Sequence, residues 1–92
     1  MWKESVKSGK STIIDVRTPG EFAGGHVAGS INIPVNEIAS RIEEIKKMKQ
    51  PIVLCCASGG RSGMATDILQ AAGLTTAHNG GPWVAVNHVK NK

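Results

Sequence analysis

The chain has 92 residues, of which 40% are hydrophobic, and a formal charge of +4 at pH 7; this size predicts one domain over residues 1–92 with a small core. No apolar run approaches the ~20 residues of a membrane span, and two tryptophans and one phenylalanine are too few for a base-stacking platform. We therefore expect neither a membrane nor a nucleic acid as a partner.

The chain has two cysteines and three histidines, and their positions limit the chemistry that it can support. The cysteines, Cys55 and Cys56, are adjacent, so a disulfide between them would close a strained ring, and no other cysteine is available. The histidines have no ligand-like spacing with them, so we expect no metal and no cofactor. Free thiols indicate a reducing compartment, which predicts a cytoplasmic protein, or a periplasmic one if the chain is a trimmed mature form.

The first third of the chain predicts a short helix, a buried strand and a second short helix. Residues 2–9 predict the first helix, and the β-branched run at 12–16 predicts the strand. Thr18, Pro19 and Glu21 have the spacing of a capping box with proline at the first helical position. A helical turn should therefore follow the first strand.

The middle of the chain predicts a glycine-rich turn around His26, a strand over 30–33 and a helix over 37–48 that Asn36 caps. The helix is predicted from apolar residues spaced four, three and three apart. These residues are Ile38, Ile42, Ile45 and Met48.

The second half predicts two further strands, each followed by a helix. Residues 51–55 form a continuous apolar run that is typical of a central strand, and 62–72 predict a helix with a buried stripe. A fourth strand is predicted over 74–78, a turn over 79–82 and a final short helix over 83–89. Strands that alternate with helices predict an α/β fold with parallel strands.

The segment CCASGGRS, residues 55–62, lies where a ligand site is expected, at the carboxyl end of the third strand. Successive backbone N–H groups in a glycine-rich loop can converge on an anion, and the following helix N-terminus adds partial positive charge. Gly59 and Gly60 can adopt backbone angles that other residues rarely adopt, and Arg61 adds a permanent cation. A cysteine at the base of this loop would have a lowered pKa without a histidine base, and its persulfide anion would be stabilised in the same way.

Two spacings decide which cysteine is the better nucleophile. Counting from Cys55 gives Cys-x5-Arg-Ser, the spacing of protein tyrosine phosphatases, but Ser58 stands where that loop has glycine and Leu54 where it has histidine. Counting from Cys56 gives Cys-x4-Arg-Ser and places Gly59 at the glycine position. The residues therefore favour Cys56 as the nucleophile and Cys55 as a small buried hydrophobe.

Four segments in this order resemble a single-domain rhodanese over about residues 10–85: IIDVRTPGEF, GHVAGSINIP, IVLCCASGGRS, and NGG with a tryptophan after it. The chain is similar to the short, phage-shock type of that family. It departs from the usual signature at Ala28, where proline is usual, and at Cys55, where an aromatic residue is frequent. The resemblance implies one rhodanese-like domain, a three-layer α/β/α fold with a small, mostly parallel sheet of four or five strands.

The resemblance also implies a sulfurtransferase. Cys56 would take a sulfane sulfur from a small anionic donor, thiosulfate or a persulfide, and pass it from a cysteine persulfide to cyanide or a thiol, a protein thiol included. Backbone N–H groups of the loop would hold that sulfur, and Arg61 would bind the donor. The expected binding residues are Ala57, Ser58, Gly59, Gly60, Arg61 and Ser62.

Two other functions compete with this one. A phosphatase or arsenate reductase of the related cell-cycle phosphatase type would need a longer loop that admits a tetrahedral oxyanion, whereas the spacing from Cys56 to Arg61 fits one sulfur atom better. A persulfide carrier or binding module would share the same cysteine, so that alternative stays open.

Four residues outside the loop receive structural interpretations. Asp15 and Arg17 match an Asp-x-Arg element at a strand end, and an ion pair or cap that supports the site is favoured over direct catalysis. His26 is expected to be a hydrogen-bonded turn residue, and Trp83 a lid on the small core.

Overall fold

A computed structural model describes residues 2–92 of the chain. Its sheet has four strands in the order β2-β1-β3-β4, and every neighbouring pair is parallel. The strands are β1 (Thr12–Asp15), β2 (Ile31–Asn32), β3 (Ile52–Cys56) and β4 (Ala77–Pro82). The expected small parallel sheet is therefore confirmed, with β1 and β3 in its centre.

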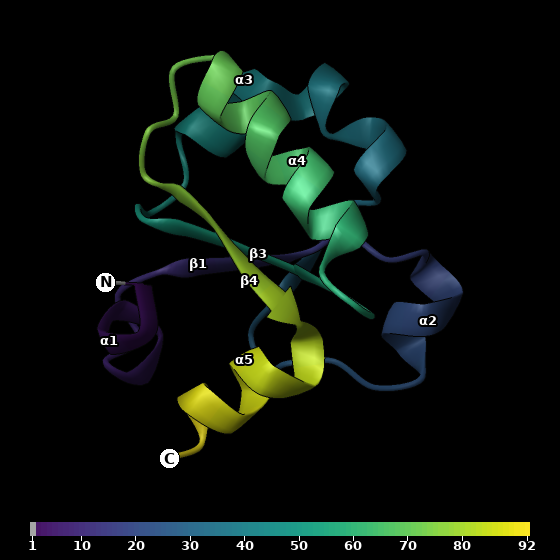
Figure 1. Ribbon diagram of the computed structural model, residues 1–92, viewed down its shortest axis with the longest axis vertical. Helices are drawn as coiled ribbons and strands as arrows, with labels where there is room; N and C mark the ends of the chain where they lie inside the picture. Colours follow the sequence, from purple (N-terminus) through teal and green to yellow (C-terminus); the bar gives the residue numbers. More distant parts are fainter. Residues whose placement is uncertain (1) are drawn as a thin grey trace.

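Helices cover both faces of this sheet, as a three-layer fold requires. The helical segments are α1 (Trp2–Lys7), α2 (Pro19–Ala23), η1 (Val35–Glu37), η2 (Ala39–Arg41), α3 (Ile42–Lys46), α4 (Gly60–Ala71) and α5 (Trp83–Lys90). Figure 1 shows α3 and α4 on one side of the sheet and α1 and α5 on the other. We call these sides the α4 face and the α5 face. No helix within residues 2–92 has the length and apolar character needed to span a bilayer.

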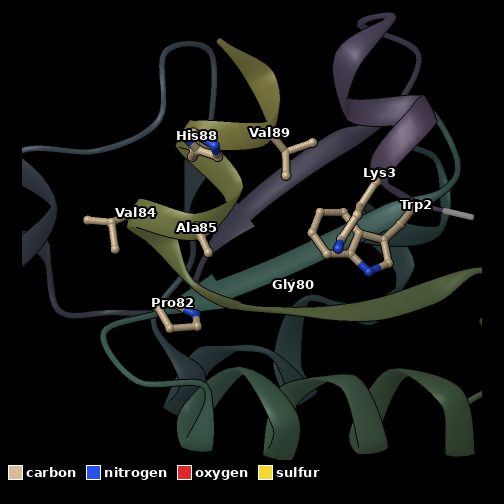
Figure 2. A pocket seen from close by; sticks show the side chains of 8 residues that line it. All are labelled: Trp2, Lys3, Gly80, Pro82, Val84, Ala85, His88 and Val89. Atoms are coloured by element: carbon tan, nitrogen blue, oxygen red, sulfur yellow. The ribbon is translucent and has the colours of Figure 1, made fainter. Parts of the chain in front are cut away.

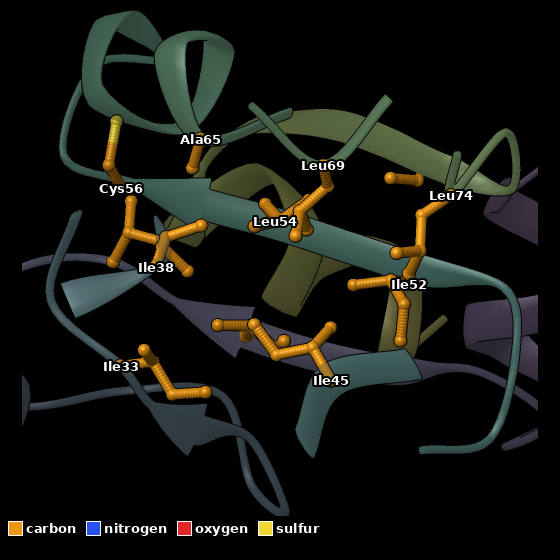
Figure 3. Close-up of a cluster of buried hydrophobic side chains, with 12 residues drawn as sticks. Ile33, Ile38, Ile45, Ile52, Leu54, Cys56, Ala65, Leu69 and Leu74 are labelled. Atoms are coloured by element: carbon orange, nitrogen blue, oxygen red, sulfur yellow. The ribbon is translucent and has the colours of Figure 1, made fainter. Parts of the chain in front are cut away.

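The core is divided between these two faces because side chains alternate along a strand. Ile52 and Leu54 of β3 belong to the larger cluster on the α4 face, which Figure 3 shows together with Ile45 of α3 and Leu69 of α4. Val53, between them, belongs to the smaller cluster on the α5 face. β3 is buried along its whole length, as its continuous apolar run predicts.

The prediction of one continuous helix over 37–48 is wrong. The structure replaces it with η1, η2 and the short α3. Arg41 has φ −119° and ψ 20°, which no helix can continue through. The apolar positions were nevertheless interpreted correctly as a buried face, because Ile38 and Ile45 are fully buried. A spacing of three residues suits the three residues per turn of a 3₁₀ helix as well as an α-helix.

The fourth strand begins and ends later than the predicted 74–78. It runs from Ala77 to Pro82 and includes the segment that was predicted to be a turn. Gly80 is the reason: a Cβ atom there would lie 2.8 Å from a methyl carbon of Val53 and 2.8 Å from one of Val86. Glycine thus allows β4 to lie close to both β3 and α5. Because glycine is also typical of turns, this part of the strand was predicted to be a turn.

Candidate functional site

Strand alternation sends the two adjacent cysteines to opposite faces of the sheet. Cys56 belongs to the cluster on the α4 face, which Figure 3 shows, whereas Cys55 belongs to the cluster on the α5 face. Both thiols are free and buried. Although the two residues are neighbours in the chain, their sulfur atoms therefore have different surroundings.

Cys56 lies where β3 passes into the active-site loop, residues 56–62, whose last three residues begin α4. The backbone N–H of Gly59 donates a hydrogen bond to Cys56 Sγ at 2.9 Å, and the Ser62 hydroxyl lies as a donor 3.3 Å from the same sulfur. Gly59 has a φ of +103°, a conformation that residues with a Cβ rarely adopt. The glycine allows the loop to turn its N–H group inward to the sulfur.

These surroundings move the pKa values of the two thiols in opposite directions. Burial opposes ionisation of Cys56, but hydrogen bonds from the Ser62 hydroxyl and from the backbone N–H groups of Ser62, Gly59 and Ser58 outweigh it, so the pKa of Cys56 is lowered. Burial, followed by the nearby Asp15 carboxylate, raises the pKa of Cys55 to about 12. At neutral pH the Cys56 sulfur is thus the better nucleophile of the two.

The remaining predicted binding residues follow Cys56 in one short turn. Ala57, Ser58 and Gly60 form the exposed part of the loop, and Ser62 is buried beneath it as the third residue of α4. α4 is long enough for its N-terminus to carry the partial positive charge of a helix dipole. The loop can therefore stabilise one negatively charged atom at the position of Cys56 Sγ.

Arg61 is paired with Glu21, which the sequence interpretation treated only as part of a capping box. Arg61 Nη1 lies 2.8 Å from Glu21 Oε1, and Nη2 lies 3.0 Å from Oε2. The capping box is also present, since Glu21 accepts a hydrogen bond from the backbone N–H of Thr18. The capping spacing in the sequence contains no signal for this second contact, because the two partners lie 40 residues apart.

Asp15 and Arg17 form a buried ion pair at the end of β1. Arg17 Nη2 lies 2.7 Å from Asp15 Oδ2, and Nε donates to both carboxylate oxygens. The same guanidinium donates to the Gly25 carbonyl at 2.7 Å and lies 4.9 Å from the ring centroid of Trp83. Arg17 therefore connects β1 with the turn after α2 and with the start of α5, and the ion pair that the sequence interpretation favoured is present.

The two other residues with structural interpretations lie as expected. His26 Nδ1 is 2.7 Å from the Phe22 carbonyl oxygen, and its ring stacks on Phe22. Trp83 packs on the cluster of the α5 face. Asn79 was predicted only as a turn residue, yet its side chain contacts Ser62 and the Gly59 carbonyl.

The pocket in Figure 2 lies on the α5 face. It has a volume of about 520 Å³ and is lined by residues of α1, the end of β4 and α5, among them Trp2, Pro82 and His88. None of residues 56–62 lines it. Within residues 2–92, no group of three or more His, Cys, Asp or Glu side chains is placed to hold a metal ion.

Comparison with known proteins links the loop to a family. The family model described as a rhodanese-like domain matches residues 2–81. Over 69 residues the chain is 41% identical to the thiosulfate sulfurtransferase PspE of Escherichia coli. This match covers 74% of this chain and 66% of that protein. Over 79 residues the chain is 40% identical to the uncharacterized protein YqhL of Bacillus subtilis. This second match covers 84% of this chain and 62% of that protein. The matches thus span slightly less than two thirds of the length of these two relatives.

A solved structure gives the same relationship in three dimensions. A rhodanese with anions from Escherichia coli superposes with a TM-score of 0.74 at 34% identity. The match covers 82% of this chain and 89% of that chain.

Proposed function

The chain belongs to the rhodanese-like domain family, and from this premise we propose that it is a sulfurtransferase that works through a persulfide on Cys56. The donor is thiosulfate or another sulfane sulfur compound of small size and negative charge. The acceptor is cyanide or a thiol, including the thiol of a protein. The observation that carries the proposal is the placement of Cys56 Sγ against the Gly59 N–H and the Ser62 hydroxyl.

In the first half of the reaction, the Cys56 thiolate attacks the outer sulfur of thiosulfate. A bond forms between Cys56 Sγ and that sulfur, the S–S bond of thiosulfate breaks, and sulfite leaves with the electron pair. The lowered pKa of Cys56 supports this step, because the thiolate is the attacking species. The residues of the loop, Ala57 to Ser62, would offer N–H groups to the negative charge that arrives on the outer sulfur.

In the second half, an acceptor thiolate or cyanide attacks the outer sulfur of the persulfide. The bond between the two sulfurs breaks, and Cys56 recovers the electron pair as a thiolate. The product is a persulfide of the acceptor, or thiocyanate. The two steps divide one transfer into two easier ones and leave the protein unchanged.

The surroundings of the loop suggest separate tasks for the other residues. Arg61 lies at the rim of the loop, where a guanidinium would attract an anionic donor. Asp15 and Arg17 would hold the neighbouring turn in place, since their ion pair joins β1 to the Gly25 carbonyl. A phosphatase reaction is less well supported, because a loop whose Gly59 N–H lies within 2.9 Å of the sulfur leaves little room for a tetrahedral oxyanion.

Mass spectrometry after incubation with thiosulfate tests this proposal. The unmodified protein should gain the mass of one sulfur atom, and peptide mapping should place it on Cys56. Cys56→Ser should abolish the gain, and Cys55→Ser should preserve it. If the added sulfur maps to Cys55, or if no sulfur is added, the proposed mechanism is wrong.

A further inference from the structure

Asn79 on β4 contacts the groups that surround Cys56, although no residue of β4 belongs to the active-site loop. Its Oδ1 accepts a hydrogen bond from the Ser62 hydroxyl at 2.7 Å and another from the Gly81 backbone N–H at 2.9 Å. Its Nδ2 donates to the Gly59 carbonyl at 3.2 Å. Because a backbone N–H can only donate, the contact with Gly81 identifies the oxygen of the Asn79 amide as the atom that faces Ser62.

The packing of α4 leaves room for this amide. A Cβ atom on Gly63 would lie 3.2 Å from Asn79 Nδ2, closer than an ordinary contact. Glycine in the first turns of a helix is otherwise unfavourable relative to alanine. The absence of a side chain at position 63 is therefore explained by the position of Asn79.

The Ser62 hydroxyl has one proton and three acceptors within reach. They are Asn79 Oδ1 at 2.7 Å, the Gly59 carbonyl oxygen at 3.2 Å and Cys56 Sγ at 3.3 Å. Ser62 is fully buried, and all three acceptors lie within 3.3 Å of its oxygen, so rotation of the O–H bond alone can move the proton from one acceptor to another. Asn79 and Cys56 thus compete for one proton.

We propose that Asn79 is a positioning residue that receives the Ser62 proton whenever Cys56 Sγ carries no charge. When Cys56 is a thiolate, the Ser62 hydroxyl turns from Asn79 to the sulfur. When Cys56 is a persulfide, the charge lies on the outer sulfur, Sγ is a weak acceptor, and the hydroxyl returns to Asn79. Asn79 therefore favours the persulfide over the thiolate. This inference rests on the proposed function and adds a residue that acts through Ser62.

Equilibration of the protein with mixtures of thiosulfate and sulfite measures the effect. The ratio of thiosulfate to sulfite that gives half persulfide is determined by intact mass. Asn79→Ala should raise this ratio by about fivefold, which corresponds to one ordinary hydrogen bond. In the same variant the pKa of the Cys56 thiol, measured from the pH dependence of its alkylation in a Cys55→Ser background, should fall, because the thiolate no longer competes with Asn79 for the proton.

Two further variants distinguish this role from a merely structural one. In a Ser62→Ala background, Asn79→Ala should change neither the ratio nor the pKa, because the proton that it acts through is gone. Asn91→Ala is the matched control, since it removes an amide that donates to the Asn87 side chain of α5 at 3.3 Å. It should behave as the unmodified protein.

Asn79→Asp keeps the size of the side chain and provides a test if Asn79→Ala does not fold. Its carboxylate should hold the Ser62 proton more strongly and raise the pKa of Cys56. Arg61 and Cys55 are charged or titratable groups that interact with Cys56, and neither side chain is altered by this substitution. Because the new carboxylate also repels the Cys56 thiolate directly, only the part of the rise that is lost in a Ser62→Ala background acts through the Ser62 proton.

Several outcomes would overturn the inference. They are an unchanged ratio and pKa in Asn79→Ala, a pKa that rises in Asn79→Ala, a fall in Asn79→Asp, or effects of equal size with and without the Ser62 hydroxyl. If no persulfide forms in the unmodified protein, the proposed function fails, but the alkylation measurements still test the role of Asn79.

Discussion

Glu21 binds both terminal nitrogens of Arg61, at 2.8 and 3.0 Å, and so joins α2 to the active-site loop. Both side chains are about one third exposed, so the pair lies at the surface beside the loop rather than in the core. The cation that the sequence suggests for donor binding is thereby already paired with a carboxylate. An anionic donor has to share Arg61 with Glu21 or displace it.

Glu21→Gln should therefore lower the KM for thiosulfate by about twofold to fivefold, with little change in kcat. A change of this size corresponds to the free energy that an exposed ion pair usually contributes. Glutamine retains the capping box, because its carbonyl oxygen can still accept from Thr18, so the fold should be kept. Steady-state kinetics with cyanide as acceptor measures the effect. Arg61→Ala should raise the KM for thiosulfate, because the attracting cation is lost.

Glu44→Gln is a matched control for this experiment. Glu44 forms an equally bidentate pair with Arg41, and the substitution changes the net charge by the same amount. Its KM should equal that of the unmodified protein. A higher KM in Glu21→Gln would show instead that Glu21 holds Arg61 in the orientation that binds the donor.

The Glu21 pair also predicts how stability depends on pH. The Arg61 guanidinium lowers the pKa of Glu21 from 4.5 to about 2. Because the folded state lowers this pKa, the contribution to stability is complete above about pH 5 and is lost progressively as the pH falls towards 2. The difference in Tm between the unmodified protein and Glu21→Gln should be constant above about pH 5 and should shrink steadily below it. A difference that stays constant down to pH 2 would contradict this origin.

Gly80→Ala should destabilise the protein by about 1–3 kcal/mol, the usual cost of forcing an extra carbon into a packed core. Its Cβ would meet Val53 and Val86 at 2.8 Å. Thermal or denaturant unfolding measures the change. Gly20→Ala is the control, since a Cβ there has no atom within 4 Å, and it should be neutral or slightly stabilising. Equal stabilities of the two variants would mean that β4 can move away from β3 without cost.

The size of the active-site loop predicts the class of reaction. The unmodified protein should transfer sulfur from thiosulfate to cyanide readily and should hydrolyse an aryl phosphate negligibly under reducing conditions. Insertion of one glycine between Ser58 and Gly59 should widen the loop, abolish sulfur transfer and permit weak phosphatase activity. Faster turnover of the aryl phosphate by the unmodified protein would reject the sulfurtransferase proposal.

Much of the fold follows from local patterns in the sequence. The apolar run before Cys55 predicts a buried central strand, the Thr18 spacing predicts the start of α2, and alternation of strands with helices predicts the parallel sheet. The strand and helix predictions are correct because they depend mainly on neighbouring residues, and the parallel sheet follows from the order of these elements along the chain. The predicted helix over 37–48 fails at Arg41, whose φ of −119° lies outside the helical range. β4 continues through the predicted turn, where Gly80 packs closely against Val53 and Val86.

The candidate site shows the same division. From the sequence alone we could predict that two cysteines end a strand and are followed by two serines, two glycines and an arginine, and the spacing favoured Cys56. The difference between the two thiols appears only in the folded structure. The faces of β3 acquire their chemistry from what packs on them, so Cys56 meets the N-terminus of α4 and Cys55 meets the apolar α5 face. Contacts such as Glu21 with Arg61 and Asn79 with Ser62 join residues far apart in the chain, and their formation depends on the arrangement of whole elements in space.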